Sequence, residues 1–145
     1  MRNKKEDLAN IIYIDKEILP ELIYMNNNSF KTCDSCAGHL YNDSVNIDFL
    51  SYITFIPIKS QIELINQLII NEQFIKKYEI GDDVGFIYEK TIDNVNLQIE
   101  FRKFDYCYIN TISIGLEISN KNITEKYWGS VKQKYYNWFF KRLIK

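Results

Sequence analysis

The chain has 145 residues, which fits one domain, and its composition of 46% hydrophobic and 15% aromatic residues excludes a disordered protein. Gly (5) and Pro (2) are too scarce for long flexible linkers. The formal net charge of −1 is unevenly spread, because residues 119–145 carry seven basic residues and one acidic residue. We therefore treat residues 1–145 as a single domain with a basic C-terminal segment.

The sequence gives no expectation of membrane insertion or secretion. Its apolar stretches fall short of the roughly 20 residues that a spanning helix needs. Charged residues interrupt the N-terminal segment, where a secretory signal requires an apolar run. Three cysteines, an odd number, fit a reducing compartment better than a disulfide framework. We therefore expect a cytoplasmic protein without a transmembrane segment.

The first third of the chain is predicted to hold a helix and two strands. Apolar residues recur at helical spacing over residues 4–25, where Pro20 is expected to kink the helix or to open a second short one. A short strand is expected at 29–33, followed by a loop rich in Asp, Ser, Gly and Asn at 34–47. Residues 49–57 are dense in aromatic and β-branched side chains, which predicts a second strand.

A second helix is predicted to begin at Ser60. Ser60 is a plausible N-cap with Glu63 in the capping-box position, and an apolar stripe continues to about residue 78. A hairpin around Asp93 is expected to follow, because its second arm alternates apolar and polar residues with a period of two.

The C-terminal third is predicted to contain a last strand at 106–118 and a helix at 123–145. Few of the predicted strands are joined by helical crossovers, which favours antiparallel pairing. We therefore expect an α+β fold in which three helices pack on an antiparallel sheet of about five strands.

One segment carries most of the reactive chemistry, and we call residues 30–39 the cysteine segment. It contains Cys33, Cys36 and His39, which are two of the three cysteines and the single histidine. Thiolate and imidazole groups are metal ligands, nucleophiles and proton carriers. A metal site, a redox pair, a ligand-binding loop and a purely structural bend are all compatible with this composition.

A zinc site is the first interpretation. Cys33, Cys36 and His39 would supply three ligands, and Cys107 from a distant strand would supply the fourth. The opposing interpretation of Cys107 is a small buried strand residue. A Cys-x-x-Cys redox pair is the second interpretation, but it normally opens a helix, and no helix-forming sequence follows here.

The third interpretation comes from a pattern of the form aromatic-x-Thr-x-x-Ser-Cys-x-Gly followed by a basic residue. The matching residues are Phe30, Thr32, Ser35, Cys36, Gly38 and His39. This pattern resembles the loop of wybutosine-synthesis methyltransferases that act on tRNA, and a group of small bacterial proteins with a Cys-x-Gly-His signature. The resemblance implies a ligand-binding loop in which Gly38 allows close approach to the backbone while Thr32, Ser35, Cys36 and His39 present polar groups.

The basic C-terminal helix is a candidate nucleic-acid contact. Its cations alternate with aromatic residues, a combination that suits phosphate contact with base stacking. The cations concerned are Lys126, Lys132, Lys134, Lys141 and Arg142. The same composition also suits a membrane surface, or an amphipathic helix whose aromatic face simply covers the sheet.

The function that the sequence favours is a ligand-binding, partner-binding or regulatory module that uses the loop from Cys33 to His39. One alternative is an enzyme that acts on RNA or a nucleotide and is similar to the wybutosine-type methyltransferases. The other alternative is a domain stabilised by zinc. Whether the chain is an enzyme is left open by its residues.

Overall fold

The computed structural model describes residues 18–38, 48–81, 85–104, 109–119 and 123–144. Within these ranges the chain forms three helices and a six-stranded antiparallel sheet, which confirms the expected α+β class. The helices are α2 (Leu19–Asn27), α3 (Lys59–Asn71) and α4 (Glu125–Leu143). The strands are β1 (Lys31–Cys36), β2 (Asp48–Ile56), β3 (Ile75–Gly81), β4 (Gly85–Ile92), β5 (Val95–Phe104) and β6 (Ile109–Ser119).

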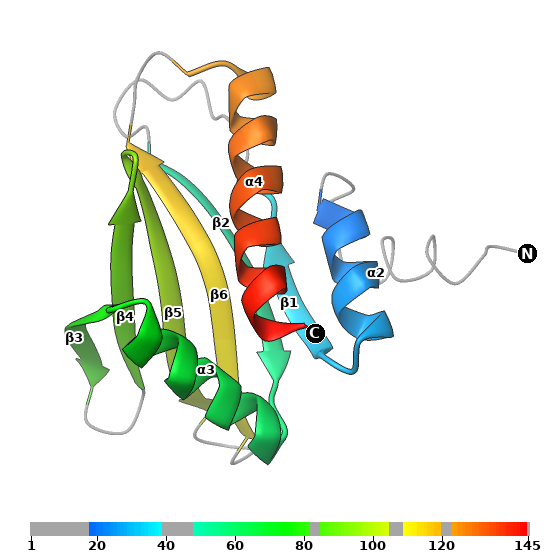
Figure 1. The fold of residues 1–145 in the computed structure, drawn as a ribbon, viewed down its shortest axis with the longest axis vertical. Helices are drawn as coiled ribbons and strands as arrows, with labels where there is room; N and C mark the ends of the chain where they lie inside the picture. Colours follow the sequence, from blue (N-terminus) through cyan, green and yellow to red (C-terminus); the bar gives the residue numbers. More distant parts are fainter. Residues whose placement is uncertain (1–17, 39–47, 82–84, 105–108, 120–122, 145) are drawn as a thin grey trace, which may run out of the picture.

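The sheet has the strand order β1-β2-β6-β5-β4-β3, and every neighbouring pair is antiparallel. Helices α3 and α4 lie across one face of the sheet, and α2 lies beside α4 near β1 (Figure 1). Strands β1 and β3 are therefore the two edges. None of the helices in the described ranges combines the length and apolarity that crossing a bilayer requires.

The core lies between the sheet and the helices and follows the alternation of the central strands. Leu97 and Ile99 of β5 and Ile114 of β6 are fully buried, while Gln98 and Ser113 between them are only partly covered. A fully buried aliphatic side chain contributes roughly 1.5–3 kcal/mol of transfer free energy. Helix α4 supplies the opposing layer through Trp128, Val131, Tyr135, Tyr136 and Phe139. The expectation that the aromatic face of this helix covers the sheet is confirmed.

The sheet has six strands rather than about five because the predicted second helix is shorter than expected. It ends at Asn71 instead of near residue 78, since Gln73 adopts a left-handed backbone conformation with φ 59°. The Phe74 N–H then donates to the Ile69 carbonyl at 3.0 Å, which closes the helix end. The following residues form β3 and pair with β4. The spacing of their apolar residues fits both the helical period and the strand period, so the sequence pattern did not indicate the change from helix to strand.

Two local predictions have different outcomes. Helix α3 is capped by Ile58 rather than Ser60, and the Ile58 N–H donates to the Gln61 side-chain carbonyl at 3.0 Å. The hairpin around Asp93 is confirmed, with φ 49° at Asp93 and φ 69° at Asn94. Both residues of such a two-residue turn need positive φ. Most of the helix predicted over 4–25 lies outside the described residues, and its described part begins one residue before Pro20.

Candidate functional site

The described part of the cysteine segment is mainly an edge strand rather than a loop. Strand β1 extends through Cys36 and pairs with β2, so the loop predicted from residue 34 begins later than expected. Thr32 is opposite the buried Phe55, whereas Cys36 is opposite Tyr52 on the face that no described helix covers. Cys33 lies at a bulge, where the register shifts. The bulge and the pleat therefore separate the polar side chains of the segment between two faces.

The Cys33 thiol does not have the environment of a reactive thiol in a redox pair. Cys33 is exposed, and partial burial raises the pKa of its thiol. The Asp34 carboxylate raises this pKa further, while the Lys31 ammonium lowers it in part. A redox Cys-x-x-Cys needs a lowered pKa, which a helix N-terminus provides. In a strand with a neighbouring carboxylate, the pKa of the thiol is raised instead.

Thr32 makes contacts within the protein. Its hydroxyl accepts from the Asn26 side-chain amide at 2.7 Å, and its N–H donates to the Asn26 side-chain carbonyl at 3.3 Å. This pair of hydrogen bonds joins β1 to the end of α2. The backbone turn that follows the helix connects the same two elements. Thr32 therefore has a structural role that is independent of any ligand.

Gly38 is required by the packing of the chain against itself. It is buried with φ 77°, and its carbonyl accepts a hydrogen bond from the Trp128 indole N–H. A Cβ at this position would stand 2.6 Å from the Leu50 carbonyl oxygen and 2.7 Å from Trp128 Cζ2. The space expected to admit a ligand is, on that side, filled by Leu50 and Trp128. The packing therefore gives Gly38 a structural reason, and its expected role in a ligand-binding loop stays a prediction.

The zinc hypothesis stays a prediction. Cys33 and Cys36 are described, while His39 and Cys107 lie outside the described residues. Among the residues that the structure describes, no group of three or more His, Cys, Asp or Glu side chains is arranged to hold a metal ion.

A buried polar pair joins the end of β1 to helix α4. The Ser51 hydroxyl donates to the Cys36 carbonyl at 2.9 Å and lies 2.6 Å from the Tyr136 hydroxyl. Ser51 and Tyr136 are almost completely buried. Burial raises the pKa of Tyr136 strongly; the hydrogen bond with Ser51 opposes this shift, and the Glu21 charge adds to it. Since all three oxygen atoms have partners, the pair fastens β1 and β2 to α4.

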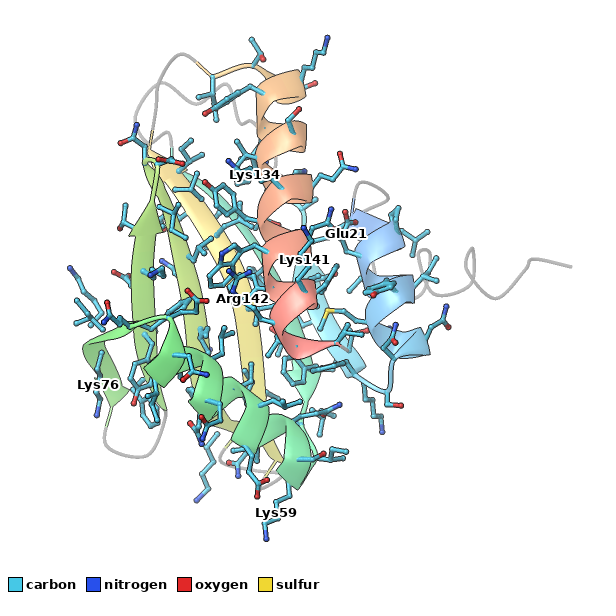
Figure 2. The ribbon with its side chains drawn as sticks, viewed as in Figure 1. Glu21, Lys59, Lys76, Lys134, Lys141 and Arg142 are labelled. Carbon is cyan, nitrogen blue, oxygen red and sulfur yellow. The ribbon has the colours of Figure 1, made fainter. Side chains whose placement is uncertain are left out.

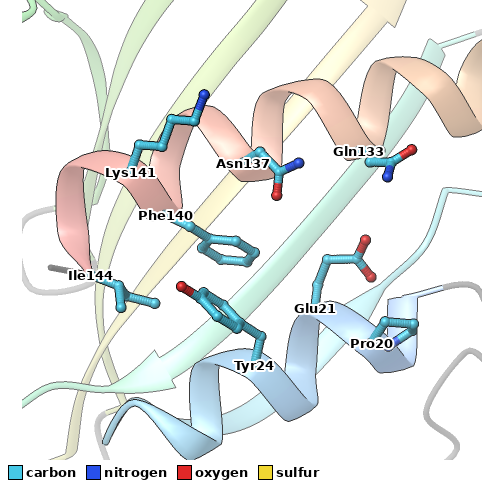
Figure 3. A pocket seen from close by; sticks show the side chains of 8 residues that line it. All are labelled: Pro20, Glu21, Tyr24, Gln133, Asn137, Phe140, Lys141 and Ile144. Carbon is cyan, nitrogen blue, oxygen red and sulfur yellow. The ribbon is translucent and has the colours of Figure 1, made fainter.

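A groove between α2 and α4 is the concave feature that we consider as a binding site. We call it the α2–α4 groove; it has a volume of about 450 Å³ (Figure 3). The rings of Tyr24 and Phe140 line it and contact each other, with centroids 5.1 Å apart. The lining residues are Pro20, Glu21, Tyr24, Gln133, Asn137, Phe140, Lys141 and Ile144. This volume lies within the range of known small-molecule sites.

Glu21 is the exceptional residue of the groove. Its Oε2 atom is buried and has no hydrogen-bond partner among the described residues. In Figure 3 the Glu21 carboxylate lies between the two helices, whereas the Lys141 side chain extends away from Glu21. An unpaired buried polar atom costs about 1–3 kcal/mol, so such atoms are rare in proteins without a functional reason. Asn96 Oδ1 is the other such atom in the described ranges, but it lies outside the groove.

The five cations predicted to contact nucleic acid have different surroundings in the structure. Lys132 is buried with its ammonium over the Trp128 ring, at 5.5 Å from the centroid. Arg142 donates to the Glu72 carboxylate at 2.8 Å and stacks on Trp138, and it points to the opposite side of α4 from Glu21 (Figure 2). The exposed cations of the predicted set are Lys126, Lys134 and Lys141. Three of the five cations are therefore available to a partner.

The chain matches no protein-family model, no curated protein and no solved structure. The class that the structure defines is therefore an α+β domain with an antiparallel sheet, covered on one face by helices that frame a groove.

Sequence reasoning missed the groove because its two walls are far apart in the chain. Glu21 is separated from Gln133 and Asn137 by more than a hundred positions, and none of the three belongs to a recognisable motif. One signal was present in the sequence. Gln133 and Asn137 lie four residues apart, on the polar side of the predicted amphipathic helix, so they share one helix face.

Proposed function

We propose that the chain is a binding module that holds a small ligand in the α2–α4 groove. The observation that supports this proposal is the buried, unpaired Glu21 Oε2 beside a cavity of about 450 Å³. This oxygen has almost no accessible surface, so a ligand would reach it through a small shift of the Glu21 side chain. A ligand N–H or O–H group that donates to it would remove the cost of leaving it unpaired. This proposal keeps the binding module that the sequence favours and assigns the ligand to the groove rather than to the cysteine segment.

The lining favours binding over covalent catalysis. Among the described residues, the lining contains no serine, threonine, cysteine or histidine. Glu21, Tyr24 and Lys141 can carry protons, but the Lys141 side chain extends away from Glu21 (Figure 3). Two side-chain amides, a carboxylate and two aromatic rings are suited instead to orienting a ligand with polar and apolar parts. The ligand would enter between two helices that both belong to the packed part of the fold.

A fragment screen followed by amide NMR spectroscopy tests the proposal. We expect some fragments to shift the amide signals of Glu21, Tyr24 and Asn137, and to bind Glu21→Gln more weakly. Glu63→Gln is the matched control, because Glu63 is an exposed helical glutamate on α3. A library in which no fragment perturbs the groove, or in which both variants bind equally well, would refute the assignment.

A second candidate is contact with RNA through the exposed lysines of α4. Lys126, Lys134 and Lys141 are exposed on this helix, which supports the sequence-based proposal in a reduced form. The methyltransferase-like activity itself rests on the resemblance of the cysteine segment alone. Phosphate contacts make binding strongly dependent on salt, so failure to bind single-stranded RNA at low ionic strength would exclude this candidate.

A further inference from the structure

We infer that the ligand of the α2–α4 groove is an organic ammonium cation with an apolar body. This inference rests on the proposed function and adds the chemical class of the ligand. It depends on three features of the groove: the unpaired carboxylate oxygen, the exposed Tyr24 ring and the side-chain amides of α4.

The charge of Glu21 favours a cation over a neutral donor. Among the described residues the ion pairs are Arg102–Glu100 and Arg142–Glu72, and neither includes Glu21. Lys141, the basic residue of the lining, extends away from the carboxylate (Figure 3). A neutral hydroxyl would satisfy one lone pair, whereas an ammonium group would satisfy it and also neutralise the charge in a partly buried site.

The aromatic walls favour the same class of ligand. The Tyr24 and Phe140 rings pack directly against each other, with centroids 5.1 Å apart and planes tilted by 45°. Phe140 is buried and Tyr24 is exposed, so a ligand in the groove would meet the Tyr24 ring. The negative face of an aromatic ring attracts cations, and the ring also buries the apolar part of a ligand. The protein already uses this chemistry on the same helix, where the Arg142 guanidinium lies 3.9 Å from the Trp138 centroid.

The amides and the size of the groove define the rest of the ligand. Asn137 points from α4 toward the groove, and Gln133 lines it one turn earlier (Figure 3). Their carbonyl oxygens can accept further N–H groups of a primary ammonium. A cavity of about 450 Å³ is far larger than an inorganic cation needs, which favours an organic body of several carbon atoms.

Three probes of one shape test the inference: 2-phenylethylammonium, 2-phenylethanol and phenylacetate. Amide NMR titration of the full chain gives the dissociation constant of each. For a probe of about nine non-hydrogen atoms we expect a value on the order of 1 mM for the ammonium. The alcohol should bind about fivefold more weakly, since it lacks the charge-assisted hydrogen bond, and the anion should not bind.

Variants show whether the preference arises in the groove. Glu21→Gln should reduce the affinity for the ammonium to that of the alcohol, whereas Glu63→Gln should leave it unchanged. Tyr24→Leu should weaken the ammonium more than the alcohol, because it removes an aromatic face. Lys141→Gln should not weaken the ammonium, although it would weaken any anionic ligand.

The outcomes separate this inference from the proposed function. Equal binding of the ammonium and the alcohol, or preferred binding of phenylacetate with loss in Lys141→Gln, overturns the cationic class and leaves the groove as a binding site. Absence of binding by all three probes also overturns the cationic class, and the wider fragment screen then decides on the groove. Ammonium chloride and magnesium chloride should not reproduce the shifts; if they do, the site binds inorganic cations and the inference is wrong.

Discussion

Helix α4 takes part in two regions that treat their polar groups in opposite ways. At the end of β1, the Trp128 indole donates to Gly38, and Ser51 links Tyr136 to the Cys36 carbonyl. In the α2–α4 groove, Glu21 has a buried oxygen atom without a partner among the described residues. In the first region the buried polar groups make internal hydrogen bonds that stabilise the fold. In the second region a buried carboxylate oxygen has no hydrogen-bond donor among the described residues.

The difference between satisfied and unsatisfied buried polar groups indicates which of the two regions is functional. A buried polar group that makes internal hydrogen bonds contributes to the stability of the fold. An unsatisfied one reduces stability and is retained where a ligand completes it. The two regions should therefore respond in opposite directions to substitution.

Gly38→Ala should have the largest effect. The new methyl group would collide with the Leu50 carbonyl and the Trp128 ring, and the backbone has φ 77°, which side chains disfavour. We expect the free energy of unfolding to fall by about 3 kcal/mol, measured by urea denaturation. Such a loss would show that the close approach at Gly38 serves the fold.

Gly129→Ala is the matched control for Gly38→Ala. Gly129 is exposed on α4, and a Cβ there would meet nothing within 4 Å. The substitution should raise the free energy of unfolding by about 0.5–1 kcal/mol, since glycine is a poor helix former. If both alanines are tolerated equally, Gly38 is not held by packing, and a ligand role for its surroundings regains support.

Breaking the Ser51–Tyr136 pair should have the next largest effect. Ser51→Ala leaves the buried Tyr136 hydroxyl without this partner, and we expect a loss of about 1–3 kcal/mol in the free energy of unfolding. Tyr136→Phe should cost less, because the Ser51 hydroxyl keeps the Cys36 carbonyl as its acceptor. A double-mutant cycle measures the coupling, and additive effects would mean that the hydrogen bond contributes nothing.

The pH dependence of the free energy of unfolding is a second test of the Ser51–Tyr136 pair. Since burial raises the pKa of Tyr136, the folded state keeps its proton while an unfolded tyrosine releases it above about pH 10. The stability contribution of this group is complete below that pH and decreases above it. Tyr136→Phe should therefore lose less stability than the wild type between neutral and alkaline pH.

The regions that the sequence predicted well are those in which one strong period dominates. The alternation of Leu97 and Ile99 on β5 predicted both a strand and its buried face, and the apolar spacing of α4 predicted the covering helix. Strand β3 was missed because its apolar residues continue the helical stripe of α3, and the left-handed Gln73 that separates them carries no turn signature.

The candidate site was predicted less well, for a physical reason. The residues with distinctive chemistry, Cys33 and Cys36, are local in the sequence and therefore visible, but they lie on an edge strand at a bulge and beside Tyr52. Glu21 acquires its unusual state only when α2 packs against α4, which is a long-range event without a local pattern. A sequence motif shows which reactive residue types are present. Whether a buried polar atom lacks a hydrogen-bond partner depends on the fold.

Glu21→Gln should change stability in the opposite direction to the substitutions at the β1 end. Replacing an unpaired, partly buried carboxylate by a neutral amide removes a desolvation cost, so we expect the free energy of unfolding to rise by roughly 1 kcal/mol without ligand. Exposed Glu63→Gln should change it by less than about 0.5 kcal/mol. A loss of stability in Glu21→Gln would show that the carboxylate has a structural partner and would remove the main support for the groove.

The reactivity of Cys33 gives the smallest effect and tests whether the β1 end has chemistry of its own. Its raised pKa means that, at any pH below that value, a smaller fraction is thiolate than in a free cysteine, and the thiolate is the reactive form. Alkylation by iodoacetamide at about pH 8 should therefore be slower at Cys33 in the folded chain than in a peptide of residues 30–36, with each site identified by mass spectrometry. Because Cys33 is exposed, slow reaction cannot be explained by complete burial. Faster reaction in the folded chain would mean that the fold activates this thiol, and the contrast between a structural β1 end and a functional groove would no longer hold.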